Sequence, residues 1–117
     1  MRVQDVMTDR VYTVSPYIPS EDAWNLMRLR RIHHLVVTED GSIVGVLSAR
    51  DFSGVKGPRA RERHTVADLM TRHAVTISPT TPVNKAANIM QGRSIGCLVV
   101  VTGRRIVGIV TVADCSN

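Results

Sequence analysis

Apolar and polar positions follow the same order twice along the chain. The segment that starts at Val3 reads VQDVMTDRVYTVSPYIPSEDAWNLM and aligns with VADLMTRHAVTISPTTPVNKAANIM, which starts at Val66. Continued without a gap at this offset of 63 residues, the alignment has 20 identical positions among 50. Chance would give roughly three, so the pattern indicates an internal duplication.

Each copy predicts the same five elements. Short runs rich in β-branched residues predict strands at 11–14, 35–37 and 43–47, and again at 74–77, 98–101 and 106–110. Apolar residues spaced at i, i+3 and i+4 predict helices over 19–31 and 82–93, and each begins with a proline, whose missing N–H costs nothing at that position. A closing helix is expected to start near Ala49 and near Ala113. The order β-α-β-β-α in both copies predicts a mixed α/β (α+β) fold.

The copies are expected to depend on each other. About 50 residues bury too little surface to be stable alone, so the two halves should share a core within one domain. We expect the first repeat at 1–52, a basic connector at 53–65 and the second repeat at 66–117. The sequence ends three residues after Asp114, so the second closing helix is expected to be truncated.

The connector, SGVKGPRARERHT, carries four of the basic residues: Lys56, Arg59, Arg61 and Arg63. Charge runs of this kind are usually solvated, and we interpret this one as an exposed linker. A net charge of +5 nevertheless attracts anions, so nucleic acid is an alternative partner. Aromatic residues make up only 3% of the chain, which argues against a surface on which bases stack.

Composition argues against a membrane protein, a secreted protein and a disulfide-rich protein. Hydrophobic residues make up 44% and charged residues 21%, as in ordinary globular proteins, and no apolar run approaches the length of a membrane span. The N-terminus lacks the apolar core of a secretory signal, and two cysteines do not make a disulfide framework. We therefore expect a cytoplasmic protein without membrane partners.

Three duplicated motifs point to a family. V-x-D-[VL]-M-T occupies 3–8 and 66–71, T-[VI]-S-P occupies 13–16 and 76–79, and G-x-x-[ST]-x-x-D occupies 45–51 and 108–114. Together they resemble the CBS-domain pair, or Bateman module, over essentially the whole chain. The resemblance implies pseudo-symmetric repeats packed through their sheets, with up to two clefts that commonly bind AMP, ADP or ATP, and sometimes S-adenosylmethionine or NAD. It also implies a disc-like homodimer and a non-catalytic regulatory role exerted on an effector protein in another chain.

The third motif supplies the candidate site. By the resemblance, Asp51 and Asp114 would accept hydrogen bonds from ribose hydroxyls, and Ser48 and Thr111 would receive phosphate at a helix entrance. Further phosphate contacts are predicted at Arg31, Arg50 and Lys56, and the adenine pocket at Thr13, Ile32, His33, Thr76, Ile95 and Gly96. The same S/T-x-x-D spacing is also that of a helix capping box, in which the two side chains satisfy only the end of the helix.

The sequence shows little evidence of a catalytic site or a metal-binding site. His33 and His34 are neighbours on a strand and point to opposite faces, and no nucleophile is accompanied by a base and an orienting group. We expect no enzyme activity, no metal and no obligatory cofactor, and we interpret Trp24 as a packing or subunit-contact residue. The alternatives to a ligand sensor are a nucleic-acid-binding adaptor and a purely structural oligomerisation module.

Overall fold

The computed structural model of the chain describes residues 1–116, and residue 117, which ends the second predicted repeat, lies outside the described residues. Helices and strands follow one another as α1 (Val3–Val6), β1 (Thr13–Val14), α2 (Ser20–Arg30), β2 (His34–Glu39), β3 (Ser42–Ser48), the 3-10 helix η1 (Ala49–Phe52), α3 (Pro58–Glu62), α4 (Val66–Leu69), β4 (Thr71–Arg72), β5 (Thr76–Ile77), α5 (Val83–Arg93), β6 (Cys97–Thr102), β7 (Arg105–Thr111) and the 3-10 helix η2 (Ala113–Cys115). None of the helices in this part of the chain has the length and hydrophobicity needed to cross a bilayer. The predicted β-α-β-β-α order is confirmed in both repeats.

The two long helices end in the same way. α2 follows Pro19 and α5 follows Pro82, as the proline preference for helix starts predicts. Each ends at a residue in the left-handed conformation, Arg31 with φ 56° and Ser94 with φ 55°. In α2 the amide of Ile32 donates to the carbonyl of Met27 at 3.0 Å, which closes a Schellman-type turn.

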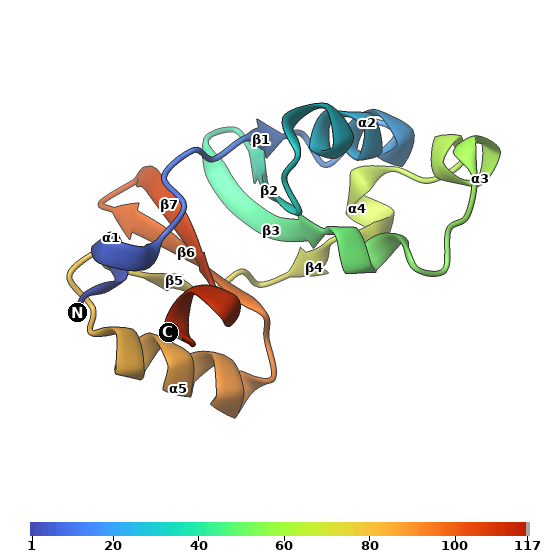
Figure 1. Cartoon of the computed structure of the whole chain (residues 1–117). Helices are drawn as coiled ribbons and strands as arrows, with labels where there is room; N and C mark the ends of the chain where they lie inside the picture. The colour runs from blue at the N-terminus through green and yellow to red at the C-terminus, as the bar shows by residue number, and fades with distance from the viewer. Residues whose placement is uncertain (117) are drawn as a thin grey trace. The chain divides into compact units, whose positions relative to one another are not determined.

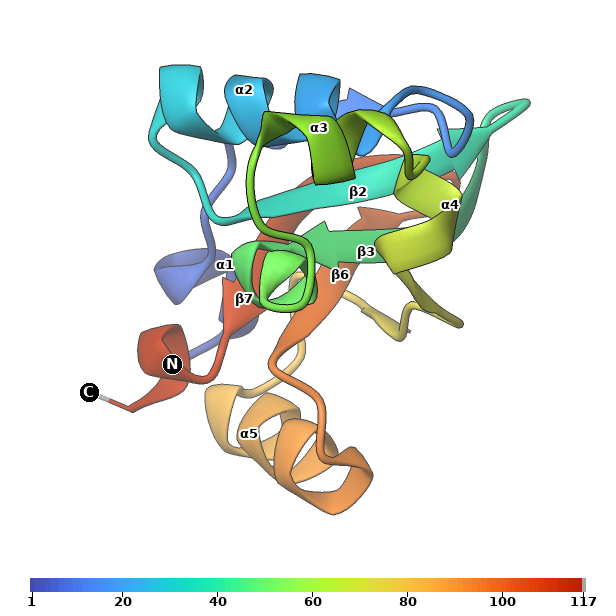
Figure 2. The ribbon, with the colours of Figure 1, turned by 90° about the vertical axis from the view of Figure 1, so that its right-hand side faces the viewer.

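Residues Tyr12–Ala74 form one compact unit around a four-stranded sheet in the order β1-β2-β3-β4. β1 runs parallel to β2, and the β2–β3 hairpin turns at Asp40 and Gly41, which both have positive φ. α2 covers one face of this sheet, and α3 lies beside α2 (Figures 1 and 2). Helix and sheet enclose a core made of Ala23, Met27, Leu35, Val37, Leu47, Phe52 and Val66.

The other compact unit combines Met1–Val11 with the described residues from Val75 onward, so the N-terminal segment packs with the second repeat (Figure 1). Its three-stranded sheet has the order β5-β6-β7, and α5 contacts β6. The core contains Val3, Ala86, Met90, Leu98, Val100 and Val110.

The short helices that open the two repeats are exchanged. α1 begins the first repeat but lies in the unit of the second, where the amide of Val3 donates to the carbonyl of Thr81 at 2.8 Å. α4 begins the second repeat but lies in the unit of the first, where the amide of Val66 donates to the carbonyl of Ile18 at 3.0 Å. The described residues form two separate cores rather than the single shared core expected, and each repeat contributes one buried valine to the core of the other.

The connector is more ordered than a solvated linker. Gly57, with φ 87°, precedes a proline that opens α3, and the hydroxyl of Ser20 donates to the carbonyl of Arg61 at 2.6 Å. The Arg61 side chain pairs with Glu21 and is only 11% exposed. The interpretation of the connector as a fully exposed charge run is therefore wrong at Arg61, while Arg59 and Arg63 are exposed as expected.

Candidate functional site

The first S/T-x-x-D motif closes the end of β3. The backbone amide of Ser48 donates to Oδ2 of Asp51 at 2.8 Å, and the Ser48 hydroxyl lies 3.4 Å from the same oxygen. These bonds cap η1, the short closing helix of the first repeat. The capping bonds use Oδ2, so the cap does not occupy Oδ1 of Asp51.

The second motif makes the equivalent backbone bond at the end of β7. The backbone amide of Thr111 donates to Oδ2 of Asp114 at 2.9 Å, and the amide of Asp114 donates to the Thr111 hydroxyl at 3.4 Å. Burial, and then the nearby Asp114 carboxylate, raise the pKa of the Cys115 thiol. This cysteine is therefore held in its protonated form and is a poor nucleophile.

Capping is a general device in this chain. Asp5 caps α1 through a 2.8 Å bond from the amide of Arg2, and Asp68 caps α4 through a 2.9 Å bond from the amide of Thr65. The capping alternative is thus confirmed for Asp51, while Asp114 accepts the equivalent bond from the amide of Thr111. Their binding of a ribose stays a prediction, and Asp5 and Asp68 provide matched carboxylates that cap helices outside the G-x-x-[ST]-x-x-D motif.

Strand register brings the motif hydroxyls onto one face of each sheet. Ser48 pairs with His34, Val36 pairs with Val46, and Thr13 pairs with Val36, so these residues alternate with the core positions of β2 and β3. Thr13 and Ser48 therefore share the face opposite to the one covered by α2. In the second repeat, Thr76, paired with Val99, and Thr111, paired with Cys97, occupy the equivalent positions.

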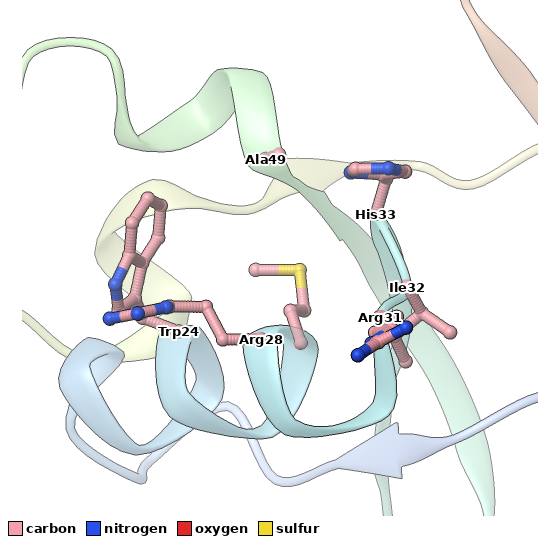
Figure 3. Close-up of a pocket in the computed structure, with 7 residues that line it drawn as sticks. Trp24, Arg28, Arg31, Ile32, His33 and Ala49 are labelled. Carbon is pink, nitrogen blue, oxygen red and sulfur yellow. The ribbon is translucent and has the colours of Figure 1, made fainter.

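A cavity of about 410 Å³ lies on the α2 side of the first repeat. Figure 3 shows Trp24 and Arg28 at one end, Arg31, Ile32 and His33 at the other, and Ala49 of η1 across from α2. Met27 also lines this cavity. A hydrogen bond of 3.0 Å from the amide of Ala49 to the carbonyl of His33 joins its two walls.

The cavity unites three of the predicted site residues, Arg31, Ile32 and His33, with four others. The exposed side chains of Arg50 and Lys56 are not among its lining residues. In the second repeat Ile95 is half-buried and Gly96 is exposed, and the carbonyl of Gly96 accepts a 3.3 Å hydrogen bond from the amide of Val112.

Sequence reasoning missed Trp24, Met27, Arg28 and Ala49 as lining residues. The interpretation of Trp24 as a packing residue is confirmed in part, because its ring lies 5.0 Å from that of Phe52 and 4.5 Å from the Arg61 guanidinium. The sequence does contain a signal for these lining residues. Trp24 and Arg28 are one helical turn apart and share a helix face with Met27, and neither is repeated at the matching position of the second copy.

Among residues 1–116, no group of three or more His, Cys, Asp or Glu side chains is placed to hold a metal ion. The site therefore consists of two capped carboxylates with neighbouring hydroxyls, and one separate cavity with basic residues.

Comparisons with known proteins agree with this architecture. The family model for the CBS domain matches residues 3–55 and 66–117. The CBS domain-containing protein YhcV of Bacillus subtilis is 31% identical over 113 residues, which cover 96% of this chain and 81% of that protein. Homoserine O-acetyltransferase of Methanohalobium evestigatum is 32% identical over 98% of this chain, but the chain spans only 23% of that enzyme.

A solved structure gives the same result. The CBS domain pair of protein MJ0100, in complex with 5′-methylthioadenosine and S-adenosyl-L-methionine, superposes with a TM-score of 0.85 at 29% identity. The superposition covers 99% of this chain and 93% of that one.

Proposed function

Because the chain belongs to the CBS domain family, we propose that it is a non-catalytic regulatory module that binds an adenosine-containing ligand. The MJ0100 pair, which holds 5′-methylthioadenosine and S-adenosyl-L-methionine, supports this ligand class. The enzymes that this chain resembles match over less than a quarter of their length, so their activities do not transfer with the match. The effector would be another protein or domain, and a homodimer is part of the proposal.

The observation that carries the proposal is the attachment of Asp51 and Asp114. Each is held at the end of a strand by a backbone amide that donates to Oδ2 at 2.8 or 2.9 Å. A carboxylate fixed in this way presents its other oxygen in a constant direction. An ionised acceptor that bonds a ribose hydroxyl contributes about 1.5–3 kcal/mol. We assign this role to Asp51 and Asp114, with Ser48 and Thr111 beside them.

The remaining predicted residues receive finer roles. Thr13 and Thr76, with Ile32, His33, Ile95 and Gly96, would surround the adenine. For a ligand that carries phosphate, such as AMP, ADP or ATP, Arg50, Lys56 and Arg31 would neutralise its charge. A neutral ligand such as 5′-methylthioadenosine would not need these cations, so the charge of the preferred ligand decides whether they take part.

Calorimetric titration with 5′-methylthioadenosine, S-adenosylmethionine, AMP, ADP and ATP tests the proposal. Asp51→Asn keeps an oxygen that can cap η1 but removes the charge, and we expect it to weaken the best ligand about 10-fold or more. Asp68→Asn changes an equivalent cap and should leave the affinity unchanged. Arg50→Gln should weaken AMP but not 5′-methylthioadenosine. Absence of heat with all five ligands, or equal affinities for Asp51→Asn and Asp68→Asn, would overturn the proposal.

A further inference from the structure

The two compact units differ in how the chain builds them. Residues Tyr12–Ala74 form one unit from a single continuous piece of chain. The other, which we call the discontinuous unit, joins Met1–Val11 to the described residues from Val75 onward. These two pieces are connected along the chain only through the continuous unit. A unit of this kind can be completed by the corresponding piece of a second molecule, as happens in domain swapping.

Backbone hydrogen bonds attach the opening segment, Met1–Thr8, to the discontinuous unit. Its helix α1 lies against β7 (Figure 1). The amide of Val3 donates to the carbonyl of Thr81 at 2.8 Å. Thr8 and Ile109 each donate an amide to the carbonyl of the other at 2.9 Å, so the segment adds an antiparallel pairing to the edge strand β7. Pairing with a sheet edge is a common way in which a fold binds a separate peptide.

Two side chains anchor the same segment. Val3 is completely buried and belongs to the core of the discontinuous unit. Met7 lies over Gly108, where a Cβ would approach its Sδ to 2.5 Å, so the glycine leaves the space that the methionine occupies. None of these contacts uses a residue of the continuous unit. The opening segment of a second copy would therefore make the same contacts.

The chain crosses between the units at two short connections, which correspond at the offset of 63 residues. Arg10 lies in the first connection and His73 in the second. His73 has a φ of 62°, a left-handed conformation that is sterically costly for a residue with a Cβ, and Arg10 has no positive φ. Strain in a short connection favours swapping, because the connection relaxes when it opens.

We propose that two copies of this chain swap their opening segments, so that Met1–Thr8 of each copy completes the discontinuous unit of the other, with His73 as the hinge. When the hinge opens, the piece that begins at Val75 moves to the opening segment of the second copy. The contacts of the segment are retained, and only the connection changes. The homodimer of the proposed function needs no such swap, so the two proposals are independent.

Cross-linking between two different variants detects the swap. Antiparallel residues that share both hydrogen bonds have Cα atoms about 5.5 Å apart, a separation that a disulfide spans. Thr8→Cys in one copy therefore meets Ile109→Cys in another only when the segments are swapped. The two variants are unfolded together in urea, refolded over a series of protein concentrations and oxidised. We expect a covalent dimer on a non-reducing gel, in a fraction that rises with concentration. Cys97 and Cys115 are present in every mixture, so their background is common to all.

Thr71→Cys mixed with Val46→Cys is the matched control. These residues form the corresponding pair of the continuous unit, where both belong to one piece of chain. The proposed swap does not separate them, so the control mixture should give at least about 5-fold less covalent dimer. Equal yields from the two mixtures would overturn the proposal. A dimer that sediments as such but gives no covalent product with Thr8→Cys and Ile109→Cys would also overturn it, and would leave the homodimer of the proposed function intact.

A chain that carries both Thr8→Cys and Ile109→Cys checks that the variants fold and that the pair is within reach. At low protein concentration it should form the disulfide within one molecule, and at high concentration between two. Formation of neither product would contradict the attachment of the opening segment to β7, on which the proposal rests.

His73→Gly tests the hinge, and Ser94→Gly is its control. Both remove a side chain from a left-handed position, but Ser94 lies inside the discontinuous unit, with φ 55° at the end of α5. Placed in both chains of the Thr8→Cys and Ile109→Cys mixture, His73→Gly should lower the yield of covalent dimer about 5-fold, because it relieves the strain that opening would release. Ser94→Gly should leave the yield unchanged. Equal yields for the two variants would overturn the assignment of His73 as the hinge.

Discussion

Arg61→Ala removes the residue that attaches the connector helix α3 to α2. In the folded protein its Nε donates to Oε1 of Glu21 at 2.6 Å, and its guanidinium lies 4.5 Å from the ring centre of Trp24. The two paired side chains are only 11% and 12% exposed. Water therefore screens this ion pair much less than an ordinary surface pair.

The expected loss of stability follows from these contacts. A charge-assisted hydrogen bond contributes about 1.5–3 kcal/mol, and a partly desolvated cation–π contact contributes about 1 kcal/mol. The substitution also leaves the Glu21 carboxylate nearly buried without its partner, which costs about 1–3 kcal/mol. Because these terms overlap, we expect a net loss of about 2–4 kcal/mol rather than their sum.

Urea unfolding followed by the emission of Trp24 measures this loss, since the single tryptophan lies in the same unit as Arg61. Arg59→Ala is the control, because Arg59 is exposed on the same helix. A double-mutant cycle of Arg61→Ala with Glu21→Gln should give a coupling energy of about 1–2 kcal/mol. If Arg61→Ala and Arg59→Ala differ by less than about 0.5 kcal/mol, the attachment contributes nothing measurable and the reasoning fails.

Two further predictions test the packing and the electrostatics. Gly45→Ala would place a Cβ 2.7 Å from the carbonyl oxygen of Thr71 in β4 and should lower stability by about 1–3 kcal/mol in thermal unfolding. Gly92→Ala is the control, because a Cβ there meets nothing within 4 Å, and it should raise stability by about 0.5–1 kcal/mol. A Gly45→Ala variant as stable as the parent would contradict the close approach of β4 to Gly45. The pKa of Tyr17 is raised above 10.0, first by its hydrogen bond to Glu39 and then by the charge of that residue. Folding therefore favours the neutral phenol. The resulting contribution to the stability of the folded state is present below pH 10 and is lost as the pH rises through the raised pKa. Glu39→Gln should return the Tyr17 pKa toward 10.0 in a titration of phenolate absorbance, and an unshifted titration would argue against the bond.

Most of the secondary structure was predictable because the two copies confirm each other. The predicted helix over 19–31 is α2, Ser20–Arg30, and the predicted strands at 35–37 and 43–47 lie in β2 and β3, which are joined by a tight turn at Asp40 and Gly41. The exchange of α1 and α4 was not predictable. Val3 and Val66 begin segments that match at four of six positions, VQDVMT and VADLMT, so the sequence does not indicate which of the two sheets each segment packs against. Which sheet each short helix packs against depends on how the chain connects the two repeats, and no local sequence pattern indicates it.

The candidate site was predictable only in part. The S/T-x-x-D spacing correctly indicated that Asp51 caps a helix. The spacing does not show whether the same carboxylate also binds a ligand. The ordered connector could have been suspected, because a glycine followed by proline is a typical start of a helix. The role of Arg61 could not, because a charge in a basic run looks solvated until its partner, Glu21, is seen 40 residues away.

The two repeats are alike at the strand ends and differ on the helix side. The backbone amides of Ser48 and Thr111 donate to Asp51 and Asp114 in the same way. On the helix side, Ala87 and Gln91 of the second copy stand where the first copy has Trp24 and Arg28. A difference in ligand preference between the two repeats would therefore have to come from residues around the carboxylates rather than from the carboxylates themselves.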